Sequence, residues 1–240
     1  MKILDDFREG IFNLCAESTS EIVLFEGLKK VAVELGFENC SYGMRIPIPV
    51  TDPGFFLLSN FPKNWEQKYV SKNYFAIDPT VQHGLRHTAP LTWSVTDPIG
   101  RPDFWEEAQQ AGLRNGWCMP VHGKFGAVGL LSLMRSEDII TEKEMLVNEA
   151  KMIWVAMTVH SSMANLIAPK VVPESSQELT PREREVLKWT AVGKTYVEIG
   201  YILSIDVRTV KFHLVNTMRK LKAANKTEAA VKAYILGMLI

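Results

Sequence analysis

Cysteine is scarce in this sequence, and long apolar runs are absent. The three cysteines, Cys15, Cys40 and Cys118, lie far apart and lack the paired spacing of a zinc site or a redox motif. We therefore expect reduced thiols in the core. No segment approaches the roughly 18 consecutive apolar residues of a membrane span, and the N-terminal MKILDDFREG lacks the apolar core of a signal peptide. The expectation is a cytoplasmic protein without a membrane partner.

The chain as a whole also has no excess of either charge, but each of its two parts carries a net charge. The 240 residues are 47% hydrophobic and 22% charged, with a formal net charge of zero. Residues 1–178 contain 16 Lys and Arg against 22 Asp and Glu, a net charge of −6; residues 179–240 contain 11 against 5, a net charge of +6. Such asymmetry indicates two domains, with an anionic partner, most commonly nucleic acid, for the second.

The change in charge coincides with a stretch of linker composition. LIAPKVVPESSQELT contains two prolines, two serines and few apolar residues at a regular spacing. We therefore predict an N-terminal domain over residues 1–165, a linker over 166–178 and a C-terminal domain over 179–240.

The C-terminal segment predicts short helices separated by tight turns. Helices are expected at 181–192, 196–203 and 207–221, each preceded by a capping Thr or Asp. Gly193 ends the first, and Ser204-Ile205-Asp206 makes the turn between the other two. Two short helices joined in this way can cross steeply, so that the second projects far enough to enter the major groove of DNA.

The third of these helices has two distinct faces. An apolar stripe at i, i+4, i+8 and i+11 should pack against the other helices: Val210, Leu214, Met218 and Leu221. Polar side chains occupy the remaining surface: Arg208, Lys211, His213, Asn216, Arg219 and Lys220. In a lone helix such residues usually form a solvated face, but the short turn, the preceding helix and the positive charge favour DNA contact.

This segment is similar to the DNA-binding domain of LuxR-type regulators. The similarity is carried by Glu183, Leu187, GKT at 193–195, EI at 198–199, TVKFH at 209–213 and NK at 225–226. The resemblance implies a four-helix domain that binds double-stranded DNA, with a last helix from about Lys226 to Leu236 available for dimer contacts. DNA contacts are expected from Lys194, Thr195, Arg208, Thr209, Lys211, His213, Asn216 and Arg219.

The N-terminal domain lacks the layout of a phosphorylated receiver, the other sensor that precedes this kind of DNA-binding domain. Asp5-Asp6 precede a helical pattern instead of following a strand. Periodicity predicts helices at 4–16, 21–35, 62–71 and 141–164 and strands at 40–46, 55–60, 117–122 and 125–134. The predicted fold class is α+β: an α/β/α sandwich with a central antiparallel sheet, followed by a small all-α helix-turn-helix domain.

Aromatic residues are concentrated between the predicted strands. In FPKNWEQKYVSKNYFAIDPTV, Trp65 and Tyr69 are four apart on one helical face, and Asp78 lies in an apolar stretch; Trp93 follows. A buried carboxylate needs a hydrogen-bond donor, which a bound amide N–H would supply. The alternative is that the aromatic residues are ordinary core and Asp78 caps a turn.

The N-terminal domain is also similar to the acyl-homoserine-lactone-binding domain of LuxR-type quorum-sensing receptors. The matching features are N-aromatic-P-x-x-W-x-x-x-Y at 60–69, DP at 78–79, Trp93, FWEEA at 104–108, GL at 112–113, Gly116 and LSL at 131–133. Ligand contacts are expected from Phe61, Trp65, Tyr69, Asp78, Trp93, Trp105 and Ser132.

The resemblance also implies individual roles. Trp65 donates its indole N–H to the lactone carbonyl, Asp78 accepts from the ligand amide N–H, and Ser132 can donate to the acyl carbonyl. Tyr69 and Trp93 wall the pocket. Phe61 departs from the family, because many relatives have a tyrosine there whose hydroxyl donates to the amide carbonyl.

Other constellations carry less chemistry. His83 and His87 lie at i, i+4 but lack a third metal ligand at suitable spacing, so we interpret them as surface residues. The glycines of GKFG at 123–126 fit a hairpin turn better than a phosphate loop. No recognisable motif supports a catalytic triad or dyad, and we predict that the protein is not an enzyme and needs no cofactor or metal.

Together these features predict a quorum-sensing transcription factor that binds an acyl-homoserine lactone and acts as a homodimer on a two-fold DNA site. Burial of the acyl chain would favour folding and dimerisation by mass action. One alternative is a receptor of the same fold that binds another small amphiphile or binds DNA without a ligand. Another is a lactone-sequestering protein that forms inactive heterodimers.

Overall fold

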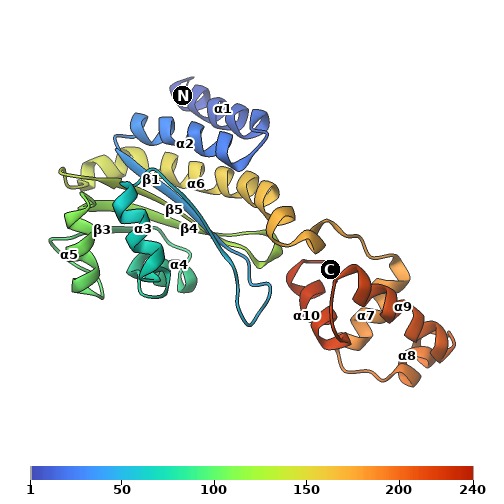
Figure 1. Cartoon of the computed structure of the whole chain (residues 1–240). Helices are drawn as coiled ribbons and strands as arrows, with labels where there is room; N and C mark the ends of the chain where they lie inside the picture. Colours follow the sequence, from blue (N-terminus) through green and yellow to red (C-terminus); the bar gives the residue numbers. More distant parts are fainter. Residues whose placement is uncertain (1, 240) are drawn as a thin grey trace. The chain divides into compact units, whose positions relative to one another are not determined.

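The computed structural model describes residues 2–239, which form two compact units (Figure 1). The first, built mainly from residues up to Leu166, contains a five-stranded sheet in which all neighbouring strands are antiparallel. The strand order is β2-β1-β5-β4-β3, with β1 Asn39–Arg45, β2 Phe55–Ser59, β3 Leu91–Ser94, β4 Asn115–His122 and β5 Val128–Arg135. The predicted antiparallel sheet is confirmed, with β3 as an additional edge strand.

Helices cover both faces of the sheet, which confirms the α/β/α sandwich (Figure 1). On one side lie α1 (Lys2–Glu17), α2 (Glu21–Glu34) and α6 (Glu142–Val171); on the other lie α3 (Lys63–Ser71), α4 (Pro79–Arg86) and α5 (Pro102–Gln110). The sequence analysis did not predict α4 and α5, although it did predict α3 and the helix at 196–203, which are of similar length. Both α4 and α5 begin with a proline at the first helical position, a start signal that was available.

Successive side chains along each strand point to opposite faces of the sheet, and the two faces have different surroundings. Tyr42 on β1 is buried toward α6, where its hydroxyl meets His160. Its neighbours Ser41 and Gly43 face the opposite way and line a cavity. One strand therefore contributes to a packed core on one side and to a candidate binding site on the other.

The last helix of the first unit is longer than predicted. The predicted end was residue 164, but α6 continues to Val171 through Pro169, and a 3₁₀ turn, Pro173–Ser176, follows. The prolines and serines of this stretch are typical of a linker. Ile167 and Ala168 are buried, so packing of an apolar face outweighs the helix-breaking tendency of the proline.

The second unit is a four-helix domain. It contains α7 (Pro181–Ala191), α8 (Tyr196–Leu203), α9 (Val207–Lys220) and α10 (Lys226–Ile235). Thr180 and Thr195 each form a capping box with the glutamate three residues later. Asp206 caps α9 by accepting from the backbone N–H of Arg208 at 2.6 Å. The predicted helix-turn-helix is confirmed.

The predicted apolar stripe of α9 needs one correction. Val210, Leu214 and Leu221 are buried, but Met218 is only half-buried, and Thr217 is fully buried instead. The Thr217 hydroxyl donates to the backbone carbonyl of His213 at 2.9 Å, which satisfies its polar group inside the helix. Apolar periodicity alone does not identify Thr217 as a core residue, because its side chain is polar.

The cysteines are free thiols, and two of them are in the core as predicted. Cys40 and Cys118 are buried, whereas Cys15 is half-buried. Burial raises the pKa of the Cys40 thiol to about 12, and it raises the pKa values of Cys118 and Cys15 as well. All three therefore remain protonated at neutral pH.

His160 is a buried histidine packed against two glycines. A Cβ atom on Gly123 would lie 2.4 Å from its Nε2, and one on Gly129 would lie 2.1 Å from its Nδ1, so only glycine leaves room for the ring. The Tyr42 hydroxyl lies 2.9 Å from Nδ1, and among the described residues Nε2 has no partner. Burial, assisted by His122, lowers the pKa of His160 to about 4.

This burial predicts a loss of stability in acid. The folded-state pKa lies below the usual value of about 6.5, so the unfolded chain binds more protons between these pH values, and stability falls as pH drops through this window. We expect His160 to account for about 3 kcal/mol of unfolding free energy between neutral pH and pH ~4. Urea titrations across this range should show a shallower loss in the double variant His160→Leu/Tyr42→Phe, which removes both polar partners.

Tyr42→Phe alone should retain the wild-type pH dependence. Asp78 contributes with the opposite sign, because its pKa is raised by burial, so the comparison with wild type is needed to isolate His160. Parallel pH profiles for the double variant and wild type would contradict the assignment.

Candidate functional site

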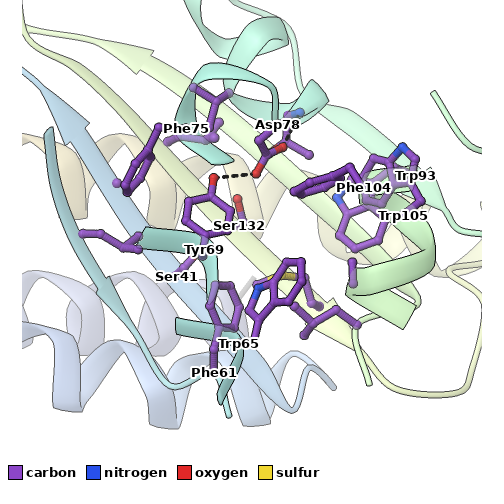
Figure 2. A pocket seen from close by; sticks show the side chains of 18 of the residues that line it. Ser41, Phe61, Trp65, Tyr69, Phe75, Asp78, Trp93, Phe104, Trp105 and Ser132 are labelled. Carbon is purple, nitrogen blue, oxygen red and sulfur yellow. Dashed lines mark hydrogen bonds between the residues drawn. The ribbon is translucent and has the colours of Figure 1, made fainter. Parts of the chain in front are cut away.

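A cavity with an empty volume of about 580 Å³ lies between the sheet and helices α3, α4 and α5 (Figure 2). Its lining is mostly aromatic and aliphatic with a few polar groups, as is typical of small-molecule sites. The structure brings all seven residues predicted to bind ligand to this cavity: Phe61, Trp65, Tyr69, Asp78, Trp93, Trp105 and Ser132.

Asp78 is the charged residue of this lining, and its two oxygens have different partners. Oδ1 accepts from the backbone N–H of Thr80 at 2.8 Å and from the Thr80 hydroxyl at 2.7 Å, which caps α4. Oδ2 accepts from the Tyr69 hydroxyl at 2.7 Å, the contact drawn in Figure 2. Burial raises the pKa of Asp78, and these hydrogen bonds oppose the rise. Asp78 is thus a helix cap that also presents an oxygen to the cavity.

The aromatic walls come from α3 and its neighbours. Trp65 and Tyr69 project from one face of α3, as their spacing predicted, with ring centroids 6.0 Å apart in an edge-to-face arrangement. Tyr74 and Phe104 pack against both rings. Both Trp65 and Tyr69 line the cavity.

Trp93 and Trp105 form the far wall. Their rings lie 4.5 Å apart, and Trp93 rests on Gly116, where an added Cβ would come within 2.4 Å of its ring. The indole N–H of Trp105 donates to the backbone carbonyl of Ile99 at 2.7 Å. Trp105 therefore contributes an apolar surface whose position is fixed by a hydrogen bond outside the cavity.

The floor of the cavity carries two adjacent serines. Ser132 on β5 is paired in register with Ser41 on β1, and both line the cavity. Both residues are buried. Sequence reasoning found Ser132 and missed Ser41; a serine at a cavity-facing position of an otherwise apolar strand was the available signal.

The remaining lining residues were also missed, because apolar side chains around a cavity look like ordinary core in a sequence. They are Gly43, Phe55, Leu57, Phe75, Thr80, Val81, Phe104, Ala108, Leu113, Leu130 and Met134. Phe61 itself is half-buried at the start of the segment leading into α3. Its ring supplies apolar surface where a tyrosine would supply a donor.

A charged cluster outside the cavity holds two of its walls together. Glu107 on α5 forms ion pairs with Lys68 at 2.6 Å and Lys72 at 2.8 Å, both on α3, and accepts from the Tyr74 hydroxyl. These donors, Lys68 first, lower the pKa of Glu107 to about 2. The cluster links the helix that carries Trp65 to the helix that follows β3.

The residues predicted to contact DNA differ in how freely their side chains are presented. On α9, Arg208, Lys211 and Arg219 are exposed, whereas Thr209, His213 and Asn216 are half-buried. The Lys211 ammonium lies 5.8 Å from the ring centroid of Tyr196. Arg219 donates to the Asn216 side chain at 3.4 Å. The three exposed basic groups leave α9 with a positive surface.

Two further predicted DNA contacts take part in the cap of α8. The Thr195 hydroxyl donates to Glu198 at 2.8 Å and accepts from the Glu198 N–H at 3.3 Å. Lys194 forms an ion pair with Glu198 at 3.1 Å. Both side chains therefore stabilise the start of α8. A DNA contact would be a second role for each of them.

The two histidines at i, i+4 contact each other and the backbone. His83 and His87 stack at 4.7 Å, and His83 contacts the carbonyl of Ala89. Across residues 2–239 no cluster of three or more potential ligands is placed to hold a metal ion. No helix in this range combines the length and apolar character needed to cross a bilayer.

An apolar cavity with convergent polar groups in one unit, and a helix-turn-helix with a basic surface in the other, define a ligand-responsive DNA-binding regulator. Residues 20–163 match the family described as autoinducer binding domain, and residues 177–233 match bacterial regulatory proteins of the LuxR family. The chain belongs to the LuxR family of quorum-sensing transcriptional regulators.

Relatives extend this similarity over almost the whole chain. The transcriptional activator protein AnoR of Acinetobacter nosocomialis is 39% identical over 238 residues, covering 98% of this chain and 100% of AnoR. The quorum-sensing regulator RhlR of Pseudomonas aeruginosa is 34% identical over 216 residues, covering 90% and 89%. The crystal structure of Escherichia coli SdiA superposes with a TM-score of 0.86 at 29% identity and covers 99% of both chains.

Substitution of Lys211 can show how α9 contacts DNA. It is exposed and lies off the buried stripe, so we expect Lys211→Ala to weaken binding to the specific promoter site by about 1–3 kcal/mol if it contacts a base edge. Binding to random DNA should change much less. Fluorescence anisotropy with both duplexes at one salt concentration measures the difference.

Lys188→Ala is the matched control, because it removes an exposed positive charge from α7 in the same domain. A uniform loss on both duplexes would mean that Lys211 contacts phosphate. Unchanged affinity for both would remove Lys211 from the interface.

Proposed function

We propose that this regulator binds an acyl-homoserine lactone in the cavity of its first unit. The observation that carries the proposal is the Asp78 carboxylate, buried among aromatic rings with Oδ2 on the cavity side. A buried carboxylate favours a ligand that brings an N–H donor into apolar surroundings, and an acyl amide does so. The division into a ligand-binding domain (1–165), a linker (166–178) and a DNA-binding domain (179–240) is part of this proposal.

The other polar groups fit the remaining parts of such a ligand. Trp65 offers an N–H to the lactone carbonyl, and Ser132, with Ser41 beside it, offers hydroxyl donors to the acyl carbonyl. The acyl chain would occupy the apolar lining, where burial stabilises by about 0.8 kcal/mol per methylene. Because the ligand completes the core, it would stabilise the folded receptor by mass action.

We further propose a cytoplasmic homodimer that recognises a two-fold promoter site. Val231 and Tyr234 on α10 are exposed apolar residues one turn apart, which supports dimer contacts through this helix. Two copies of α9 would then read two half-sites related by symmetry.

A second candidate ligand is another small amphiphile. SdiA has been solved in complex with octanoyl-rac-glycerol, and that structure superposes with a TM-score of 0.86 at 29% identity, covering 100% of this chain and 97% of SdiA. A sequestering role through inactive heterodimers is the other alternative. Specific DNA binding by the purified protein alone would argue against sequestration.

The two roles of Asp78 can be separated by substitution. Asparagine retains a carbonyl oxygen for the cap of α4 but places an NH₂ donor where Oδ2 accepts, so Asp78→Asn should keep the ligand-free stability nearly unchanged. Calorimetry with a lactone should show binding weakened by roughly 1.5–3 kcal/mol, because two donors would face each other.

Asp78→Ala provides the comparison, because it loses the cap as well and should cost about 1–2 kcal/mol of stability in urea. If Asp78→Asn bound the lactone as tightly as wild type, Asp78 would be a structural cap only. If it unfolded like Asp78→Ala, the charge rather than the cap geometry would hold the site together.

Because Phe61 lacks a hydroxyl, lactone binding should depend more on Ser132 than it would with a tyrosine at position 61. Ser132→Ala should weaken lactone binding by about 0.5–1.5 kcal/mol in the Phe61 background, and by less in Phe61→Tyr, where the restored hydroxyl can donate to the same carbonyl. A double-mutant cycle by calorimetry should give a coupling of at least about 0.5 kcal/mol.

Ser41→Ala is the control, since Ser41 is the register partner of Ser132 and can take over its hydrogen bond. The cycle should therefore be repeated in Ser41→Ala, where the coupling should grow. Strict additivity in both backgrounds would show that Phe61 and Ser132 do not share an acceptor.

A further inference from the structure

The cavity floor is built of successive rows of residues across strands β2, β1 and β5. Ser59, Ser41 and Ser132 form one row; Leu57, Gly43 and Leu130 form the next; Phe55, Arg45 and Val128 form the third. Two residues along a strand separate neighbouring rows, so the first and third rows are about 13 Å apart. The floor thus changes along the strands from a row of three serines to rows that are mostly apolar, with Arg45 in the third.

A second, smaller cavity lies at the third-row end of this floor. It has an empty volume of about 290 Å³, and its lining includes Arg45, Gly84, Leu85 and Val128. Four residues line both cavities: Gly43, Phe55, Val81 and Leu130. The two cavities therefore meet at the second and third rows, beneath helix α4.

Phe55 lies at this junction. Its ring covers Gly43, because a Cβ added there would lie 2.8 Å from Phe55 Cζ. On its other side the ring packs against Phe75, with centroids 3.8 Å apart. Glycine leaves the space over the strand unfilled, and the phenylalanine ring fills it, so Phe55 lies between the two cavities together with Val81 and Leu130, which also line both.

We propose that Phe55 sets the longest acyl chain that the receptor accepts. The inference rests on the proposed function, in which the ligand amide lies near Asp78 and Ser132 and its chain runs along the floor toward the third row. Chains that end before Phe55 are buried in the larger cavity. Longer chains must displace the ring from Gly43 and Phe75 before they reach the second cavity, and they lose the packing of that ring.

Gly84 offers an independent change in the second cavity. It lies on α4, and a Cβ there would be 3.2 Å from Leu130 Cδ1 and 3.6 Å from Pro120 Cβ. Gly84→Ala therefore adds a methyl group beyond Phe55, which requires the end of the Leu130 side chain to shift by a few tenths of an ångström, and alanine favours the helix. Of the two cavities, Gly84 lines only the smaller one.

The test measures Kd for the full-length protein against acyl-homoserine lactones from butanoyl to tetradecanoyl. Wild-type affinity should rise about fourfold per added methylene and then fall beyond one chain length. Phe55→Ala should move this limit to longer chains. Gly84→Ala should leave the wild-type limit unchanged but shorten the extended limit of Phe55→Ala. Ligand-free urea unfolding verifies that each variant is folded.

An unchanged limit in folded Phe55→Ala would overturn the inference, and so would a shorter limit in Gly84→Ala alone, since the wild-type chain would then already pass Phe55. A parallel series of 1-monoacylglycerols separates the inference from the proposed function. If only the glycerols bind and their limit depends on Phe55, the lactone proposal fails and the inference stands. If lactones bind without a Phe55-dependent limit, the lactone proposal stands and the inference about Phe55 fails. If neither series binds the folded wild type, the lactone proposal and the inference are both wrong.

Discussion

Burial of one carboxylate among aromatic rings is the constraint around which the first unit is organised. Removing Asp78 from water is costly unless its oxygens accept hydrogen bonds, and the fold supplies them from the start of α4 and from Tyr69 on α3. The same side chain therefore fixes the beginning of one helix, ties it to a second, and leaves polar capacity facing the cavity. Folding and ligand recognition depend on a shared group, so a ligand that satisfies it should also favour the folded state.

The antiparallel sheet separates stability from recognition by the period of two residues along its strands. Residues such as Tyr42 face α6 and a tightly packed core, in which His160 fits only because Gly123 and Gly129 lack side chains. Ser41 and Gly43, the neighbours of Tyr42, face the cavity. Changes on the cavity side can thus alter which ligand fits without disturbing the packing that holds the sheet to α6.

Local signals predicted the second unit well, because its helices begin at Thr180, Thr195 and Asp206, whose capping role depends on a few adjacent residues. The sandwich and its sheet were predicted from periodicity, whereas α4, α5 and the four-residue strand β3 were not. Tertiary packing decided what remained: the extension of α6 past Pro169 and the burial of Thr217. Four of the seven cavity residues, Trp65, Tyr69, Asp78 and Trp93, stood out in the sequence pattern, whereas Phe61, Trp105 and Ser132 came from family resemblance. Ser41 and Phe55 were missed because strand pairing is what places them on the cavity floor.

The protonated state of the cysteines has a consequence for what this regulator can sense. Oxidation and alkylation proceed through the thiolate, and Cys40 and Cys118 are both buried and held as thiols by their raised pKa values. Peroxide or a change in the thiol redox potential of the cell should therefore react slowly with the cysteines in the core of the ligand-binding unit. Cys40 and Cys118 are therefore poorly suited to act as a thiol-based switch in that unit.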